Sequence, residues 1–102
     1  MSDWIEVMSV ETFSGPCEVV EVEGYSIALF RLNDGYYAID DECSHDVASL
    51  GEGEIVEECK IECPKHGALF DIKTGESLTL PAVVGVKSYP VKIEDGMILV
   101  NI

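Results

Sequence analysis

Two short motifs place every histidine of the chain beside a cysteine. Cys43 and His45 are separated by one residue, Cys63 and His66 by two, and residues 46–62 lie between the pairs. Thiolates and imidazoles are common protein ligands of zinc and of iron–sulfur clusters. Two loops that each offer one thiolate and one imidazole can therefore bring four ligands of mixed softness to a single point.

The order of the ligand types distinguishes two candidate metal groups. Zinc sites with two cysteines and two histidines commonly pair cysteine with cysteine and histidine with histidine. Here each pair is mixed, which favours a [2Fe–2S] cluster in which one iron takes two cysteines and the other takes two histidines. A zinc-stabilised binding module is the alternative, and a metal assay separates one zinc per chain from two irons with two sulfides.

The other two cysteines, Cys17 and Cys59, are interpreted as small apolar residues and not as ligands. Cys59 shares strand parity with Ile61 and Cys63, which suits an inward-facing position. Once both histidines are assigned to a metal group, no arrangement of catalytic acid, base or nucleophile is left. We therefore expect no autonomous enzyme.

The composition predicts one acidic globular domain. The 102 residues include 20 Asp and Glu against six Lys and Arg, for a formal net charge of -14, yet 47% are hydrophobic. That content and length suit a single buried core.

A surface this negative disfavours nucleic acid and anionic membranes as partners and favours basic protein surfaces. No apolar run approaches the roughly 20 residues that span a bilayer, and the acidic N-terminus does not resemble a secretory signal. We expect a cytoplasmic protein.

Frequent turn signals predict antiparallel β-structure, because they separate short runs rich in Val, Ile, Tyr and Phe. The signals are Glu23-Gly24, Asn33-Asp34-Gly35, Lys73-Thr74-Gly75 and Asp95-Gly96. Residues 25–32 are apolar on both faces and predict a central strand. Residues 87–93 alternate and predict a half-exposed strand with Tyr89, Val91 and Ile93 on one side.

Helical signals are few. Residues 9–13 predict about one helical turn with Ser9 as its cap, and no helix of ordinary length is expected. The middle segment, residues 40–81, contains three of the four cysteines and both histidines, and its strand signals are short. We interpret it as an inserted metal-binding subdomain on a base formed by residues 1–39 and 82–102.

The two motifs resemble those of Rieske proteins, most closely the small soluble ferredoxins of multicomponent aromatic-ring-hydroxylating dioxygenases. The similarity covers essentially the whole chain. It rests on Cys43-Ser44-His45 with residues 48–51, and on Glu62-Cys63-Pro64-Lys65-His66-Gly67 with Phe70 and Gly75 downstream. The resemblance implies an all-β Rieske fold, in which an antiparallel β-sandwich base carries a small inserted cluster-binding subdomain. It also implies that Cys43 and Cys63 hold one iron, while His45 and His66 hold the other through their Nδ1 atoms.

The function implied by the resemblance is that of a one-electron carrier. One Rieske-type [2Fe–2S] cluster would take an electron from a flavin-containing ferredoxin reductase and deliver it to a terminal oxygenase. The chain would act as a monomer without a small-molecule substrate of its own. The second function is that of a small Rieske-like subunit of an assimilatory nitrite reductase, which would copurify with its partner through a larger apolar surface.

Two positions in the second motif bear on the reduction potential. Respiratory Rieske proteins resemble this sequence but place Ser and Tyr hydroxyls near the cluster, where Ala68 and Phe70 stand here. Fewer hydrogen bonds to sulfur leave the added electron less stabilised. We therefore expect a potential toward the lower end of the roughly -150 to +300 mV Rieske range. Nearby acids, among them Asp41, act in the same direction.

Overall fold

Antiparallel strands make up most of the computed structural model, which describes residues 4–42, 49–65, 67–79 and 84–102. The molecule is elongated, with extents of 39 × 29 × 18 Å. One short 3₁₀ helix, η1 (Leu50–Glu52), is the helical element of the described residues. The strands are β1 (Trp4–Ser9), β2 (Cys17–Val22), β3 (Tyr25–Leu32), β4 (Gly35–Asp40), β5 (Glu54–Val56), β6 (Lys60–Glu62), β7 (Leu69–Asp71), β8 (Ser88–Tyr89), β9 (Val91–Glu94) and β10 (Met97–Asn101).

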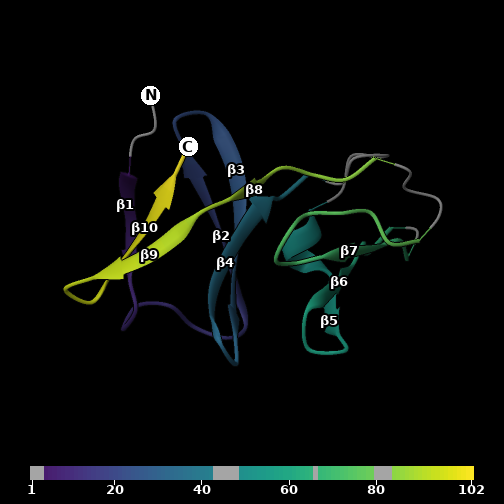
Figure 1. Cartoon of the computed structure of the whole chain (residues 1–102), viewed down its shortest axis with the longest axis horizontal. Coiled ribbons are helices and arrows are strands. Elements are labelled where there is room, and N and C mark those ends of the chain that lie inside the picture. Colours follow the sequence, from purple (N-terminus) through teal and green to yellow (C-terminus); the bar gives the residue numbers. More distant parts are fainter. Residues whose placement is uncertain (1–3, 43–48, 66, 80–83) are drawn as a thin grey trace.

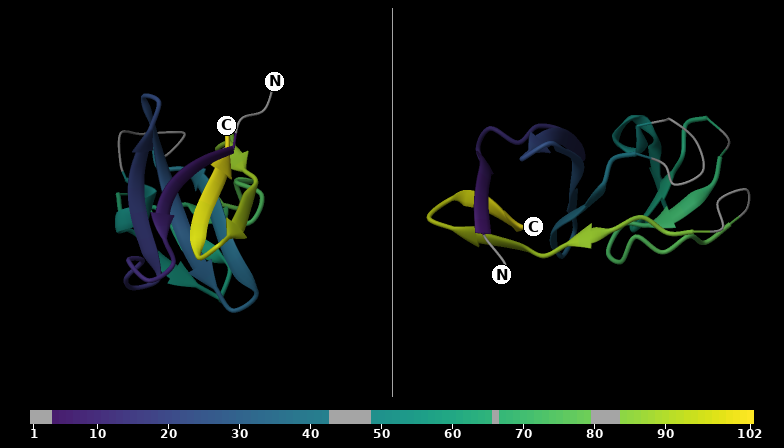
Figure 2. Two further views of the ribbon diagram at one scale, coloured as in Figure 1. Left: turned by 90° about the vertical axis from the view of Figure 1, so that its left-hand side faces the viewer. Right: turned by 90° about the horizontal axis from the view of Figure 1, so that it is seen from above.

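The strands form three sheets with the orders β1-β10-β9, β2-β3-β4-β8 and β5-β6-β7. Within each sheet, neighbouring strands pair in the antiparallel direction. The first two sheets lie together at one end of the molecule, and the third sheet lies at the other end (Figures 1 and 2). The predicted all-β antiparallel fold is confirmed.

Strand β3 is the central strand that residues 25–32 predict, and it borders two separate cores. Ile27 and Leu29 pack in the core between the first two sheets. Ala28 and Phe30 point to the opposite face, into the core shared with the third sheet. All four side chains are fully buried. Because successive side chains of a strand alternate between faces, two cores require the continuous apolar run seen in this segment.

Two of the predicted turns are two-residue hairpin loops. Glu23 and Gly24 join β2 to β3 with φ angles of 49° and 88°, and Asp95 and Gly96 join β9 to β10 with φ angles of 51° and 76°. Positive φ at both central residues is the type I′ geometry, whose twist matches that of the flanking strands. These loops set the pairing register of both hairpins.

The predicted strand over residues 87–93 is divided, and this part of the prediction is wrong. Pro90 separates β8, which pairs with β4, from β9, which pairs with β10. Proline has no N–H for a ladder, so the chain changes sheets at this point. Tyr89 is buried, whereas Ile93 is 44% exposed, and the two side chains do not share one buried face.

Residues 9–13 form a hydrogen-bonded turn and not a helix. Ser9 has the predicted capping role, since its hydroxyl accepts a hydrogen bond from the Thr12 N–H at 3.1 Å. Its carbonyl accepts a second bond from the Phe13 N–H at 3.2 Å, and the turn ends there. The described residues contain no helix with the length and apolar character that crossing a bilayer requires.

Candidate metal centre

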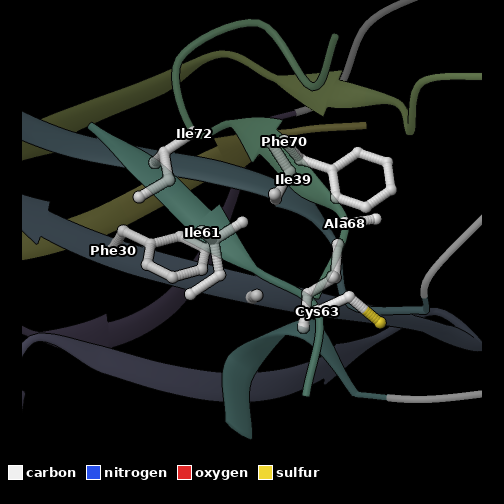
Figure 3. Packing of buried hydrophobic residues seen from close by; sticks show 9 residues of the cluster. Phe30, Ile39, Ile61, Cys63, Ala68, Phe70 and Ile72 are labelled. Carbon is white, nitrogen blue, oxygen red and sulfur yellow. The ribbon is translucent and has the colours of Figure 1, made fainter. Parts of the chain in front are cut away.

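Cys63 lies at the start of a tight loop between β6 and β7. Its N–H donates to the Ala68 carbonyl at 2.7 Å, and its carbonyl accepts from the Gly67 N–H at 2.9 Å. The side chain is 1% exposed and packs in the core that β3 shares with the third sheet. Figure 3 shows Cys63 and Ala68 side by side at one end of this core, away from Ile72. The second motif is thus anchored by its first residue.

The flanks of the first motif are held together by backbone pairing. Asp41 directly follows β4, and its carbonyl accepts from the Leu50 N–H at 2.6 Å. Glu42 and Ser49 form an isolated antiparallel bridge. Leu50 is fully buried in the same core as Cys63. Residues 42 and 49 therefore lie side by side.

One open hollow of about 600 Å³ is lined by the flanks of both motifs. Asp41, Glu42 and Ser49 line it from the first motif, and Pro64 and Lys65 line it from the second. The fold therefore brings these two distant parts of the sequence together. Three predicted ligands, Cys43, His45 and His66, lie outside the described residues.

The chain beyond the second motif returns along β7. Ser77 forms an antiparallel bridge with Phe70, and the Leu78 N–H donates to the Leu69 carbonyl at 2.8 Å. The Thr79 hydroxyl accepts a further bond from the Leu69 N–H at 2.8 Å. A side-chain acceptor thus continues the ladder where backbone pairing ends, a role that nothing in the sequence pattern indicates.

Side-chain contacts reinforce the second sheet and join it to the turn after β7. The Tyr89 hydroxyl donates to Asp40 at 2.5 Å, which ties β8 to the end of β4. Burial raises the pKa of Tyr89, and this hydrogen bond adds to the effect. Lys73, in the turn after β7, donates to Asp34, in the turn between β3 and β4, at 2.8 Å. This contact lowers the pKa of Asp34.

Cys17 has an environment that suits the predicted structural role, whereas Cys59 lies in the turn before β6, outside the core. Both are half-buried, and neither forms a disulfide with a described cysteine. Cys17 packs against the core of the third sheet. Burial, together with the nearby Asp41 and Glu18 carboxylates, raises the pKa of Cys17 from 9.0 to about 12. Since a metal takes the thiolate, this environment disfavours Cys17 as a ligand.

The raised pKa of Cys17 predicts a specific loss of stability in alkaline solution. Between pH 9 and 12 the folded chain keeps the thiol proton, whereas an unfolded chain has lost it. The contribution is complete below pH 9 and disappears as the pH rises toward 12. We expect Cys17→Ala to flatten the fall of the unfolding free energy over this range, as measured by urea unfolding at a series of pH values. The parent and the variant share every other titrating group. If their unfolding free energies fall in parallel between pH 9 and 12, the raised pKa of Cys17 is contradicted.

A comparison with protein families decides what the two loops represent. The model of the Rieske [2Fe–2S] domain matches residues 3–90. This chain belongs to the Rieske family. The Rieske chain is 45% identical, over 76 residues, to the 3-phenylpropionate/cinnamic acid dioxygenase ferredoxin subunit of Escherichia coli K12, covering 74% of this chain and 72% of that protein.

Solved structures agree with the family assignment of the Rieske chain. The ferredoxin of carbazole 1,9a-dioxygenase from Nocardioides aromaticivorans IC177 is 34% identical, with a TM-score of 0.88 and 95% of each chain covered. A complex of reduced oxygenase and oxidized ferredoxin in carbazole 1,9a-dioxygenase contains a similar chain, with 31% identity and a TM-score of 0.86. That match covers 95% of this chain and 91% of the other.

The described residues fit the [2Fe–2S] group of the Rieske family. Cys63 offers a thiol that is in no disulfide with a described cysteine, and the flanks of both motifs line one hollow. When bound, such a cluster takes up and releases one electron at a time. Near this place Asp41 is a buried acid, and its run of neighbouring acids in the sequence does not indicate this structural role.

Proposed function

We propose that this Rieske protein is a soluble electron carrier that delivers single electrons to the terminal oxygenase of an aromatic-ring-hydroxylating dioxygenase system. The observation that carries the proposal is the 45% identity to a dioxygenase ferredoxin subunit over most of both chains. The oxygenase–ferredoxin complex supports the choice of partner. The same likeness favours this function over a nitrite reductase subunit.

The proposed ligands are Cys43 and Cys63 for one iron and His45 and His66 for the other. The division into a base of residues 1–39 and 82–102 and a cluster-binding subdomain of residues 40–81 is part of the same proposal. Cys63 supports it because its side chain is shielded from water and its loop is closed by two backbone hydrogen bonds. A ligand held in this way needs little rearrangement when the charge of the group changes.

The proposed setting is the cytoplasm, with a flavin-containing ferredoxin reductase as electron donor and a monomeric carrier that moves between its partners. The chain itself catalyses no reaction, in keeping with its relatives named as ferredoxin subunits. Its net charge of -14 favours basic docking surfaces on those partners.

Two measurements test the proposal. Electron paramagnetic resonance of the reduced protein should show the lowered average g value of a cluster with histidine ligands, and His45→Cys should change that spectrum or abolish it. Mixing reduced protein with a terminal oxygenase should then oxidise it within a single turnover. A normal Rieske spectrum without electron transfer to any dioxygenase would agree with the family assignment but exclude the proposed role.

Docking is expected to depend on salt. Raising the ionic strength from about 20 to 300 mM should slow electron transfer to the oxygenase about tenfold, because screening weakens the attraction between the acidic carrier and a basic surface. Stopped-flow absorbance measures the rate. Oxidation by ferricyanide is the control, since a small anion is repelled and its rate should rise with salt. A transfer rate that does not vary with salt would rule out electrostatic docking.

Ala68 is expected to influence the reduction potential. The side chain is fully buried next to Cys63, and Ala68→Ser would place a hydroxyl donor where respiratory relatives have one. A net hydrogen-bond contribution of about 1 kcal/mol corresponds to an increase of about 40 mV for one electron. Protein-film voltammetry measures the shift. Ala38→Ser, at a buried position in the other core, is the matched control and should leave the potential unchanged.

A further inference from the structure

Asp41 is the buried charged residue of the described chain, with only 7% of its surface exposed. Burying a carboxylate is costly unless donors satisfy it. Two donors do so here: the Ser49 hydroxyl at 2.9 Å and the Gly51 N–H at 2.8 Å, both bonded to Oδ1. Both donors lie beyond residues 43–48, whereas Asp41 precedes them. The carboxylate therefore spans the two ends of the segment that contains Cys43 and His45.

This contact replaces an ordinary helix cap. Ser49 occupies the N-cap position of η1, but its hydroxyl makes no capping bond and donates to Asp41 instead. The N–H that an N-cap side chain would normally bind, that of Gly51, is bound by Asp41. The Asp41 carbonyl also accepts from the Leu50 N–H. Asp41, directly after β4, thus supplies both the side-chain and the backbone acceptors at the start of η1.

We infer that Asp41 is a positioning residue that fixes the first ligand loop in the geometry required for cluster binding, an inference that rests on the proposed ligands Cys43 and His45. If the Asp41 carboxylate is removed, the half-buried Gly51 N–H and Ser49 hydroxyl lose their acceptor. The backbone bridge between Glu42 and Ser49 would still close the loop but would leave its return path less constrained. The proposed ligands Cys43 and His45 would then be less well ordered.

The variant Asp41→Ala tests the inference, and Asp41→Asn is the rescue. Asparagine keeps a carbonyl oxygen that can accept both hydrogen bonds, so it should retain the loop geometry. We expect Asp41→Ala to release iron to a chelator at least tenfold faster than the parent protein and to broaden or shift the g values of the reduced protein. Asp41→Asn should release iron within about twofold of the parent rate and keep its g values.

Asp71→Ala is the matched control. Asp71 Oδ1 also accepts two bonds from nearby N–H groups, those of Lys73 at 2.8 Å and Thr74 at 3.2 Å, but it serves the turn after β7. This variant should lower the unfolding midpoint without changing the g values. Equal effects of Asp41→Ala and Asp71→Ala on iron release, or a failure of Asp41→Asn to rescue, would overturn the inference.

The same experiment separates failure of the inference from failure of the proposed function. Iron release and spectra are measured on the purified protein and need no oxygenase. A parent protein with a Rieske spectrum and an unaltered Asp41→Ala variant would refute only the role of Asp41. A parent protein without such a spectrum would refute both, because the loop would then hold no cluster.

Discussion

Replacing Cys63 with serine is expected to give a folded protein that contains no [2Fe–2S] cluster. Serine nearly preserves the shape of the buried side chain, and the backbone bonds of residue 63 to Ala68 and Gly67 need no thiol. A hydroxyl does not ionise near neutral pH, so the anionic ligand is lost. Iron and acid-labile sulfide should both fall from about two per chain to near zero.

Two other substitutions serve as controls for the Cys63→Ser variant. Cys17→Ser and Cys59→Ser should keep the full iron content, since both residues are assigned structural roles. Far-ultraviolet circular dichroism should show that each variant retains its β-structure. Two irons per chain with an unchanged spectrum in Cys63→Ser would remove this residue from the ligand set.

Replacing Gly75 with alanine is expected to cause a large loss of stability from a single added methyl group. Gly75 has φ of 81°, and an added Cβ would lie 2.1 Å from the Val86 carbonyl oxygen. The Gly75 carbonyl in turn accepts from the Val86 N–H at 2.8 Å, so the turn is held against the segment that returns to the base. Strain and overlap together should cost about 3–5 kcal/mol. Guanidinium unfolding followed by circular dichroism measures the loss.

Gly96→Ala is the matched control for that prediction. Gly96 has a similar φ of 76°, but an added Cβ would meet nothing within 4 Å. Its variant should lose only the backbone contribution, about 1–2 kcal/mol. The difference between the two variants reports the close contact between the turn and Val86. Equal losses would show that this contact does not limit the structure.

Local signals predicted β3 and two hairpin turns well. The apolar run of residues 25–32 specified β3 to the residue, and the positive-φ turns at Glu23-Gly24 and Asp95-Gly96 lie where their sequences indicated. Prediction failed at Pro90, where alternation of apolar residues continued although the hydrogen-bonding partner changed from β4 to β10. A change of partner depends on tertiary packing, which alternation alone does not encode.

The metal centre shows the same division between local and long-range information. The spacing of Cys63 and His66 predicted the second loop, and the structure buries Cys63 at the start of that loop. The role of Asp41 could not be predicted, because it is one of three consecutive acids and only the return of Ser49 and Gly51 distinguishes it. Buried hydrogen bonds between segments of this kind have no periodic signal.

The two-sided burial of β3 links the alignment of the third sheet to that of the first two sheets. A slip of β3 by one residue would exchange Ile27 and Leu29 with Ala28 and Phe30, so both cores would receive side chains of the wrong size at once. The penalty for a register error is therefore imposed from both faces. Cys63 lies in the core that Ala28 and Phe30 fill, so its position depends on the register of β3.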